Sequence, residues 1–310
     1  MISLPLISII TPSLNRAEFI EEAIQSVLDQ DYPNVEHIIV DGGSTDGTLE
    51  VLARYPHLRV ISEPDNGVYD AINKGIKFAH GEILGFLNTD DYYEPKVLSD
   101  LTNEFMINPD AYALSGGSIL FKMNFHGTSE VISRNSCTYK HNQLVHATLE
   151  ESSFNSWFFR RAVFDEIGFF SSKYKLLADR DFLIRFALKK TPIISLDKVL
   201  YHYLQHSGSL TFKGYYDMGG EIGLEACYIS EYYLQDQGIK QNERNIFRAW
   251  HTHVTVKQVF SALKKISFSS AIRAASKGYQ YDRGWPIAFV TGLPFSTANY
   301  IRYKIWTDKR

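Results

Sequence analysis

Residues 6–15, with the sequence LISIITPSLN, decide the fold, because a short apolar run leads directly into polar, turn-forming residues. The apolar part, residues 6–10, has the length and composition of a buried β-strand. Residues 18–28 follow, and their apolar side chains recur at helical spacing. This stretch therefore predicts a strand followed by a helix, the first unit of an α/β protein.

The same pattern continues along the chain. The further predicted strands are 35–40, 58–61 and 83–87, and the predicted helices after them are 46–53, 68–79 and 95–107. Four βα units in succession predict a mostly parallel central sheet with helices on both faces. Beyond residue 112 the alternation loosens, with predicted strands at 157–160 and 199–204, predicted helices at 162–167 and 179–188, and a helical pattern from residue 215 onward.

Each of the four predicted strands ends in a polar, glycine-rich or acidic segment. These segments are 11–15 (TPSLN), 41–48 (DGGSTDGT), 63–67 (EPDNG) and 88–91 (NTDD). The carboxyl ends of parallel strands meet at one edge of a sheet, and ligands bind there in open α/β folds. We therefore expect the functional site at this edge.

Asp90 and Asp91 are adjacent carboxylates just past a predicted buried strand. Their mutual repulsion favours a compensating hard cation, Mg²⁺ or Mn²⁺, that bridges a carboxylate and a diphosphate. The alternative is a turn that caps the helix starting near Pro95. The position of the pair as the fourth of four polar strand ends favours the metal site.

The glycine-rich segment 41–48 lets a ligand approach the backbone, and Asp41 at the strand end can accept hydrogen bonds from a base or ribose. A plain turn in which Ser44 or Thr45 caps the next helix is compatible with that role. The segment lacks the spacing of a dinucleotide fingerprint or a Walker loop, which argues against NAD and ATP sites.

Residues 177–185 (LADRDFLIR) open a predicted helix. Asp179 at its start would be held by backbone N–H groups, and a carboxylate there can take a proton from an attacking hydroxyl. Asp181 has the spacing of an i,i+4 ion pair with Arg185. The pattern favours Asp179 for chemistry and Asp181 for structure.

In this order and spacing the segments resemble glycosyltransferase family 2. The resemblance continues through residues 63–75 (EPDNGVYDAINKG), 157–161 and 178–182, and covers about residues 5–211. It implies a GT-A fold over residues 1–211, with residues 212–310 as a helical C-terminal extension. It also implies an inverting enzyme that transfers a sugar from a nucleotide-diphosphate sugar, UDP-linked by analogy, to a hydroxyl of a glycan or lipid-linked acceptor.

The resemblance assigns roles to individual residues. The implied nucleotide-sugar contacts are Thr11, Pro12, Asn15, Asp41, Gly43, Asp65, Lys74, Asn88, Asp90 and Asp91. Within this set, Asp41 would bind the base, and Asp65 and Lys74 would lie beside the uridine and diphosphate. Asp90 would hold Mn²⁺ or Mg²⁺, and Asp179 would be the catalytic base.

Three positions depart from the family pattern. Asn88 replaces the first Asp of the Asp-X-Asp motif, so it can contact a ribose but lacks the charge. Ala178 replaces the Glu of the Glu-Asp motif and leaves the base intact. In residues 203–211, Leu204 occupies an Arg position, while His206 remains a candidate metal or diphosphate ligand. Residues 151–156 are candidates for sugar choice.

Two other functions remain open from the sequence. A nucleotidyltransferase also combines a parallel sheet with acidic metal ligands, but residues 11–16 offer only Arg16 as a basic group for a triphosphate. A degenerate sugar-nucleotide-binding protein without activity is favoured by Asn88 and Leu204, whereas the intact Asp90 and Asp179 argue against it.

Charge is distributed unevenly along the chain. Residues 1–239 carry 19 Lys and Arg against 32 Asp and Glu, a net charge of −13, while residues 240–310 carry 13 against 3, a net charge of +10. The basic segment 240–310 favours an anionic membrane surface as a partner, with an amphipathic stretch at 254–266 that puts Val256, Val259, Phe260 and Leu263 on one face. Packing of its aromatic residues onto the catalytic domain or into a homodimer interface is equally compatible. We expect no nucleic-acid partner.

The apolar start of the chain, residues 1–10, lacks a basic segment and predicts a strand rather than a signal peptide. Cys137 and Cys227 show no disulfide spacing, which favours a reducing compartment. We therefore expect a cytoplasmic protein, at the inner face of the plasma membrane if the basic segment binds lipid.

Overall fold

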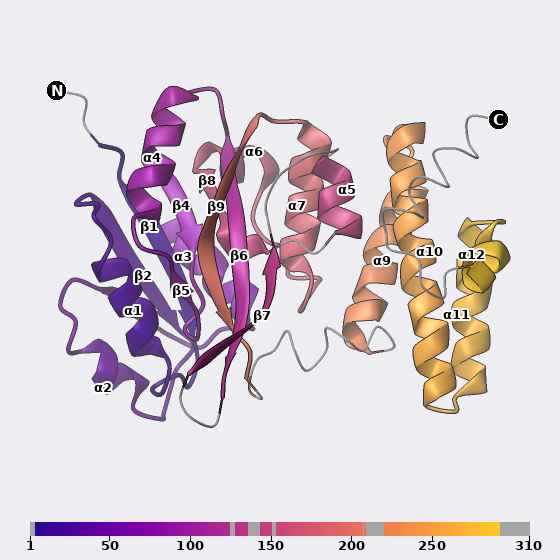
Figure 1. The fold of residues 1–310 in the computed structure, drawn as a ribbon, viewed down its shortest axis with the longest axis horizontal. Coiled ribbons are helices and arrows are strands. Elements are labelled where there is room, and N and C mark those ends of the chain that lie inside the picture. The colour runs from indigo at the N-terminus through magenta and orange to yellow at the C-terminus, as the bar shows by residue number, and fades with distance from the viewer. Residues whose placement is uncertain are drawn as a thin grey trace. The chain divides into compact units, whose positions relative to one another are not determined.

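The computed structural model describes residues 4–124, 128–135, 143–150, 153–206, 208 and 220–291. The chain divides into two compact units, one formed by residues 1–140 and 153–206, the other by residues 141–152 and 207–310. Within the described residues, the first unit contains a nine-stranded sheet and the second is helical (Figure 1). The predicted domain boundary after residue 211 lies outside the described residues.

The four predicted βα units are present in the first unit. Strands β1 (Ile7–Ser13), β2 (Val35–Asp41), β3 (Arg59–Ser62) and β4 (Ile83–Phe86) are parallel and lie in the order β3-β2-β1-β4. Helices α1 (Ile20–Leu28), α2 (Thr48–Leu52), α3 (Val68–Phe78) and α4 (Val97–Ile107) follow them along the chain. The α/β fold with a parallel sheet at its centre is therefore confirmed.

Beyond β4 the sheet becomes mixed. Strand β8 (Trp157–Arg160) is antiparallel to β4 and to β6 (Ala113–Met123), and β9 (Ile193–Leu204) is parallel to β6. Strands β5 (Tyr92–Tyr93) and β7 (Ser129–Asn135) pair antiparallel with β9 and β6. The sequence indicated only mixed strand and loop for β6, because Gly116 and Gly117 interrupt its pattern. Gly116 is needed there, since a Cβ would lie 2.3 Å from the side chain of Leu200.

Helices cover both faces of the sheet (Figure 1). Ile9 belongs to a buried cluster with side chains of α1 and α4, including Val27 and Leu98. Its neighbour Ile10 points to the opposite face, where it packs so closely against α3 that a Cβ on Gly75 would lie 2.4 Å from it. Helices α6 (Ala162–Ile167) and α7 (Ala178–Lys189) contribute to an aromatic cluster of Phe86, Phe154, Phe159, Phe164, Phe170, Phe182 and Phe186.

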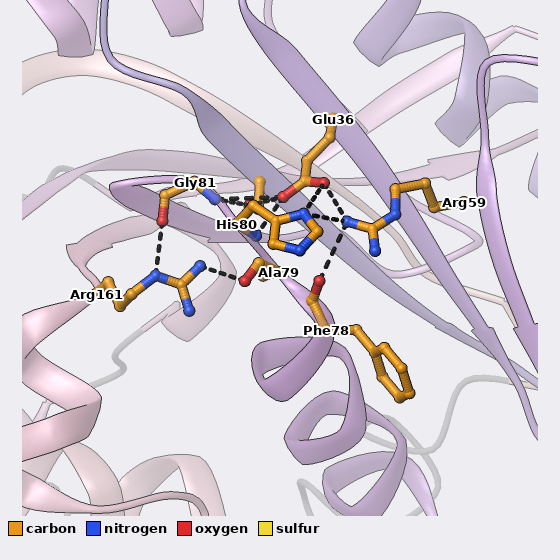
Figure 2. Close-up of polar contacts among 8 residues, drawn as sticks. Glu36, Arg59, Phe78, Ala79, His80, Gly81 and Arg161 are labelled. Atoms are coloured by element: carbon orange, nitrogen blue, oxygen red, sulfur yellow. Dashed lines mark hydrogen bonds and ion pairs between the residues drawn. The ribbon is translucent and has the colours of Figure 1, made fainter.

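A polar cluster near the amino ends of β1 and β2 joins β2, β3 and the end of α3 (Figure 2). The Glu36 carboxylate accepts hydrogen bonds from the Ser8 hydroxyl at 2.6 Å and from the His80 N–H, and forms an ion pair with Arg59. Arg161 donates to the carbonyl oxygens of Ala79 and Gly81, at 2.6 and 3.0 Å. Because it lies away from the carboxyl ends of the strands, we interpret this cluster as structural.

The second unit contains α5 (Gln143–Leu149), α9 (Glu221–Gln235), α10 (Gln241–Lys264), α11 (Phe268–Tyr281) and α12 (Trp285–Thr291). Its core packs Val256 and Val259 of α10 against Trp285 and small residues of α11. The Trp285 indole donates to the Thr255 hydroxyl at 2.9 Å. No helix in the described part of the chain has both the length and the apolar character needed to cross a bilayer.

This packing corrects one prediction from the sequence. Val256 and Val259 are buried, and Phe260 packs against the same cluster, so three of the four predicted amphipathic residues belong to the core of the helical unit. Leu263 is the exception, with 40% of its surface exposed. Val256, Val259 and Phe260 are therefore covered within the helical unit and are not available to a membrane.

Candidate active site

The loops after β1 and β2 are joined by reciprocal hydrogen bonds at the carboxyl edge of the sheet. The Asn15 side-chain oxygen accepts from the Thr45 N–H at 2.9 Å, and the Asn15 N–H donates to the Ser44 hydroxyl at 2.7 Å. Asn15 has a φ of 53°, a left-handed conformation that Asn tolerates better than most residues. The sequence prediction that these segments meet is confirmed.

Thr11 and Pro12 lie within β1, beneath this edge. The Thr11 hydroxyl is fully buried and lies 2.9 Å from Nε2 of His37. Burial, reinforced by the charge of His57, lowers the pKa of His37 to about 3, so the imidazole is neutral at physiological pH. Pro12 is half-buried and pairs in register with Val40 of β2.

Asp41 ends β2 and is fully buried. Its carboxylate accepts hydrogen bonds from the Gly43 N–H at 3.1 Å, the Ser44 N–H at 2.9 Å and the Ser62 hydroxyl at 2.8 Å. These bonds shape the loop after β2, whose backbone turns at Gly43 with a φ of 90°. A Cβ on Gly43 would contact nothing within 4 Å, so the loop presents open space at this residue.

Asp65 and Lys74 lie beside this loop. The Asp65 carboxylate accepts from the Gly67 N–H at 2.8 Å and packs against Gly42, where a Cβ would lie 2.5 Å from Asp65 Oδ2. Lys74, on α3, donates to the Pro64 carbonyl at 2.8 Å and pairs with Glu63 at 2.9 Å. The loop after β3 and helix α3 therefore bring an acidic and a basic group to the edge formed by the first two strands.

Asp90 lies next to His206, which follows β9. Its Oδ2 is 2.8 Å from His206 Nε2, and the two side chains are 15% and 18% exposed. The His206 ring packs against Phe19, with ring centroids 4.7 Å apart. The described residues contain no group of three or more metal-ligating side chains. A carboxylate and an imidazole nevertheless fit Mg²⁺ or Mn²⁺, because such ions complete their coordination with phosphate oxygens and water.

The Asp91 carboxylate, by contrast, accepts three hydrogen bonds from other groups of the protein. The donors are the Tyr201 hydroxyl at 2.7 Å, the Leu204 N–H at 2.9 Å and the Asn88 side-chain amide at 2.9 Å. Burial and the neighbouring Asp90 raise the pKa of Asp91 to about 8. The Tyr201 hydroxyl also accepts from Asn155 at 3.1 Å. Asp91 thus anchors the loop after β4, and the Asn88 amide nitrogen is already engaged.

Asp179 lies in the first turn of α7, as expected from the sequence. Burial raises its pKa, against the effect of the Arg180 N–H, which donates to the carboxylate at 2.7 Å. The Tyr69 hydroxyl forms a hydrogen bond with Asp179 and lies 3.2 Å from the Leu176 carbonyl. Asp181 pairs with Arg185 at 2.9 Å, which confirms the predicted i,i+4 ion pair.

Tyr203 of β9 is within electrostatic range of Asp90 and Asp91, in the loop after β4, and of Asp179 on α7. Burial raises the pKa of its phenol well above 10, and the charges of Asp91, Asp179 and Asp90 add to the shift. The three carboxylates therefore lie within electrostatic range of one side chain.

Residue patterns alone did not identify Tyr203, Tyr201, Tyr69 or Phe19 as site residues. For Tyr201 and Tyr203 the sequence does carry a signal: they are two residues apart in β9, and residues at this spacing lie on the same face of a strand.

Comparison with known proteins supports the fold and shows the family. Glycosyl transferase family 2 matches residues 8–168, just over half of the chain. The chain is 37% identical over 121 residues to the putative teichuronic acid biosynthesis glycosyltransferase TuaG of Bacillus subtilis. That match covers 37% of this chain and 48% of TuaG, so it spans about half the length of the relative.

Two solved structures share the fold. S. aureus TarS 1–349, in complex with UDP-GlcNAc, has a TM-score of 0.59 at 19% identity, covering 93% of this chain and 92% of TarS 1–349. The mannosyltransferase PcManGT from Pyrobaculum calidifontis, in complex with GDP-Man and Mn²⁺, has a TM-score of 0.58 at 17% identity, covering 100% of this chain and 89% of PcManGT. The fold, the strand-end loops and the extent of the family match lead to one conclusion: the chain belongs to glycosyl transferase family 2.

Proposed function

We propose that this protein is an inverting glycosyltransferase that moves a sugar from a nucleotide-diphosphate sugar, with UDP as the nucleotide, to a hydroxyl of a glycan or lipid-linked acceptor. The observation that carries the proposal is the placement of the Asp90–His206 pair and the buried Asp179 around Tyr203. In this arrangement the Asp90–His206 pair would supply a cation site and Asp179 would supply a base, two functions that serve a single displacement.

Several contacts support the assignment of the donor to the loops after β1, β2 and β3. Asn15, the open backbone at Gly43, and the charged side chains of Asp65 and Lys74 lie along this edge, with the half-buried Pro12 just beneath it. Thr11 and Asp41 are fully buried, and in this proposal they support the nucleotide pocket from beneath. The UDP-GlcNAc bound to TarS and the GDP-Man bound to PcManGT support a nucleotide sugar as the donor.

Asp90 and His206 would hold the divalent cation, and the Mn²⁺ in PcManGT supports this choice of metal. A bound cation would neutralise the charge that builds up on the departing diphosphate. Asp91 would keep Asp90 in place through Tyr201, Asn88 and the Leu204 backbone, rather than contact the ion itself.

Asp179 would accept the proton of the acceptor hydroxyl while that oxygen attacks the anomeric carbon from the face opposite the leaving group. The raised pKa of Asp179 makes it a stronger base than an exposed aspartate. The bond to the diphosphate breaks as the new glycosidic bond forms, and the configuration at the anomeric carbon is inverted. Proton transfer of this kind contributes about 10²–10⁴-fold to the rate.

The proposal extends to the acceptor and to the location of the enzyme in the cell. TuaG carries a name from teichuronic acid biosynthesis, which supports a polysaccharide or its lipid-linked precursor as the acceptor. We propose that the enzyme works in the cytoplasm, at the inner face of the plasma membrane.

Calorimetric titration of UDP with and without Mn²⁺ tests the site. In the wild type Mn²⁺ should strengthen UDP binding, and Asp90→Ala should abolish that gain because it removes the carboxylate that anchors the cation. Asp100→Ala is the control, since Asp100 pairs with Lys198 outside the site. Retention of the full Mn²⁺ effect in Asp90→Ala would refute the proposed metal site. A donor-transfer assay on the same proteins separates an enzyme from a binding protein.

A further inference from the structure

The turn between α10 and α11 exposes an unusual number of large apolar side chains. We call residues 263–272, at the end of these two helices, the hairpin tip. Its exposed apolar residues are Leu263, Ile266, Phe268 and Ile272, with exposed fractions of 40%, 77%, 65% and 67%. None of them belongs to the core of the helical unit, which is built from Val256, Val259, Trp285 and their neighbours.

Ile266 is unfavourable here for two separate reasons. It follows the last turn of α10 with a φ of 55°, and the Ser267 N–H donates to the Ala262 carbonyl at 2.8 Å. This is the helix-terminating arrangement in which glycine is preferred, because a β-branched side chain strains a left-handed backbone. Its side chain is also left in water. Glycine would relieve both costs, so neither folding nor solubility explains an isoleucine at this position.

The charge around the hairpin tip has one sign. Lys264 and Lys265 are exposed and directly precede Ile266 in the sequence. From Arg244 to Tyr281 the chain has seven Lys or Arg residues and no Asp or Glu. The exposed apolar residues therefore belong to a basic segment of the chain, which is complementary to an anionic surface that also has an apolar interior.

We propose that the hairpin tip docks on an anionic lipid bilayer, with Ile266 and Phe268 inserted among the acyl chains and Lys264 and Lys265 on the headgroups. A nucleic acid would match the lysines but offers no apolar layer for the exposed side chains. A second copy of the chain would place like charges opposite each other. A bilayer with anionic headgroups matches both features, because lysines near its surface are attracted to the headgroups.

The inference deepens the proposed membrane location and, of the residues on the predicted amphipathic face, retains only Leu263. Val256 and Val259 lie in the core, whereas the hairpin tip presents residues that the packing leaves outside. The test of this inference uses neither sugar donor nor acceptor. A negative result would therefore refute the docking surface without refuting the proposed transfer reaction. A failure of the transfer assay would likewise leave the docking surface untouched.

Co-sedimentation of the full chain with vesicles tests the proposal. One set contains phosphatidylcholine alone, and the other contains phosphatidylcholine with one-third phosphatidylglycerol. We expect binding to the second set at low salt and release as salt screens the attraction. Ile266→Gly should weaken binding about tenfold or more, because it removes the apolar side chain that inserts among the acyl chains. Its unfolding midpoint should stay the same or rise, because glycine relieves the strained backbone.

Matched control variants test whether vesicle binding depends on the hairpin tip itself or on net charge and exposed apolar side chains in general. Lys264→Glu/Lys265→Glu should lose vesicle binding, whereas Lys189→Glu/Lys190→Glu should retain it. The control pair is also exposed and adjacent, at the end of α7, and it carries the same change in net charge. Phe268→Ser should weaken binding, whereas Ile107→Ser, at a residue that is 73% exposed in the first unit, should not.

Three results would overturn the proposal. The first is equal recovery of the wild type in the supernatant with both vesicle sets at low salt. The second is equal loss of binding in the hairpin-tip and control lysine variants, which would mean that net charge alone drives the attraction. The third is a concentration-dependent dimer in sedimentation velocity that Ile266→Gly abolishes, without vesicle binding, which would assign the surface to a second copy of the chain.

Discussion

The phenol of Tyr201 donates a 2.7 Å hydrogen bond to the carboxylate of Asp91, and this bond ties β9 to the loop after β4. The same loop carries Asp90, and β9 leads to His206, so the bond sets the distance between the two proposed cation ligands. The Leu204 N–H strengthens the link by donating to the other Asp91 oxygen at 2.9 Å. The cation site is therefore held by a buried network that need not contact the ion.

We predict that Tyr201→Phe weakens both the fold and Mn²⁺-dependent UDP binding. The variant removes the donor to Asp91 and the acceptor of the Asn155 amide, at a cost of about 1–3 kcal/mol for buried polar groups left unpaired. Urea unfolding measures the first effect and calorimetry the second. Tyr93→Phe is the control, because its buried hydroxyl donates only to the Phe86 carbonyl within the described contacts. Equal losses of UDP binding in both variants would show that Tyr201 has no specific role in the site.

Asp179 and Asp181 are two residues apart, but we predict that replacing the first lowers turnover and replacing the second lowers stability. Asp179→Asn should keep donor affinity within a few-fold of wild type and lower turnover by about 10² or more, since the amide cannot accept a proton. Asp181→Asn should lower the free energy of unfolding by about 1–3 kcal/mol, because it breaks the partly buried pair with Arg185. Near wild-type turnover in Asp179→Asn, with a loss in folded Asp181→Asn, would reverse the two assignments.

The pH dependence of turnover should reflect the raised pKa of Asp179. Only the carboxylate form is a base, so turnover should rise with pH, with a midpoint above the ordinary value of 3.8 for an aspartate. The effect on stability has the opposite sign. Because the fold favours the protonated form, the stabilising contribution of Asp179 is complete below pH 3.8 and is lost as pH rises through the raised pKa.

Comparing wild type with Asp179→Asn in unfolding experiments across pH tests this linkage. The asparagine variant should lack the part of the pH-dependent decline that Asp179 causes. Superimposable stability profiles for the two proteins would contradict the raised pKa.

Glu36 should contribute to stability with the reverse pH dependence. Burial opposes its ionisation, but hydrogen bonds from the Ser8 hydroxyl, the His80 N–H and Arg59 outweigh burial and lower its pKa (Figure 2). Its contribution is therefore present above the ordinary pKa of 4.5 and is lost as pH falls through the lowered pKa.

Glu36→Gln should cost about 1–3 kcal/mol of unfolding free energy at neutral pH, in line with hydrogen bonds to charged groups. The difference from wild type should shrink in acid. Glu130→Gln is the matched control, because Glu130 forms an exposed ion pair with Lys122 that is worth about 0–1 kcal/mol. A cost for Glu36→Gln that stays constant down to strongly acidic pH would contradict the lowered pKa.

The sequence alone predicted the features that depend on neighbours along the chain. Apolar spacing within single strands and helices predicted the four βα units, and the polar residues after each strand predicted the edge where a ligand would bind. The Asp181–Arg185 pair was predictable for the same reason, since residues four apart on a helix lie on one face. The β6 strand was not, because two glycines accommodate the neighbouring strand and break the local pattern.

Tertiary structure decided what each polar side chain faces. The sequence placed Asp91 beside Asp90 among the nucleotide-sugar contacts, and the fold gives it Tyr201, a residue 110 positions away, as a donor. His206 meets Asp90 across 116 positions, and Val256 turns inward because α11 and α12 cover it. Sequence periodicity reports which side chains share one face of an element, but the partner of that face depends on how distant elements pack. For this reason the polar candidates at the strand ends could be named from the chain, whereas the aromatic residues around them and the contacts of each candidate could not.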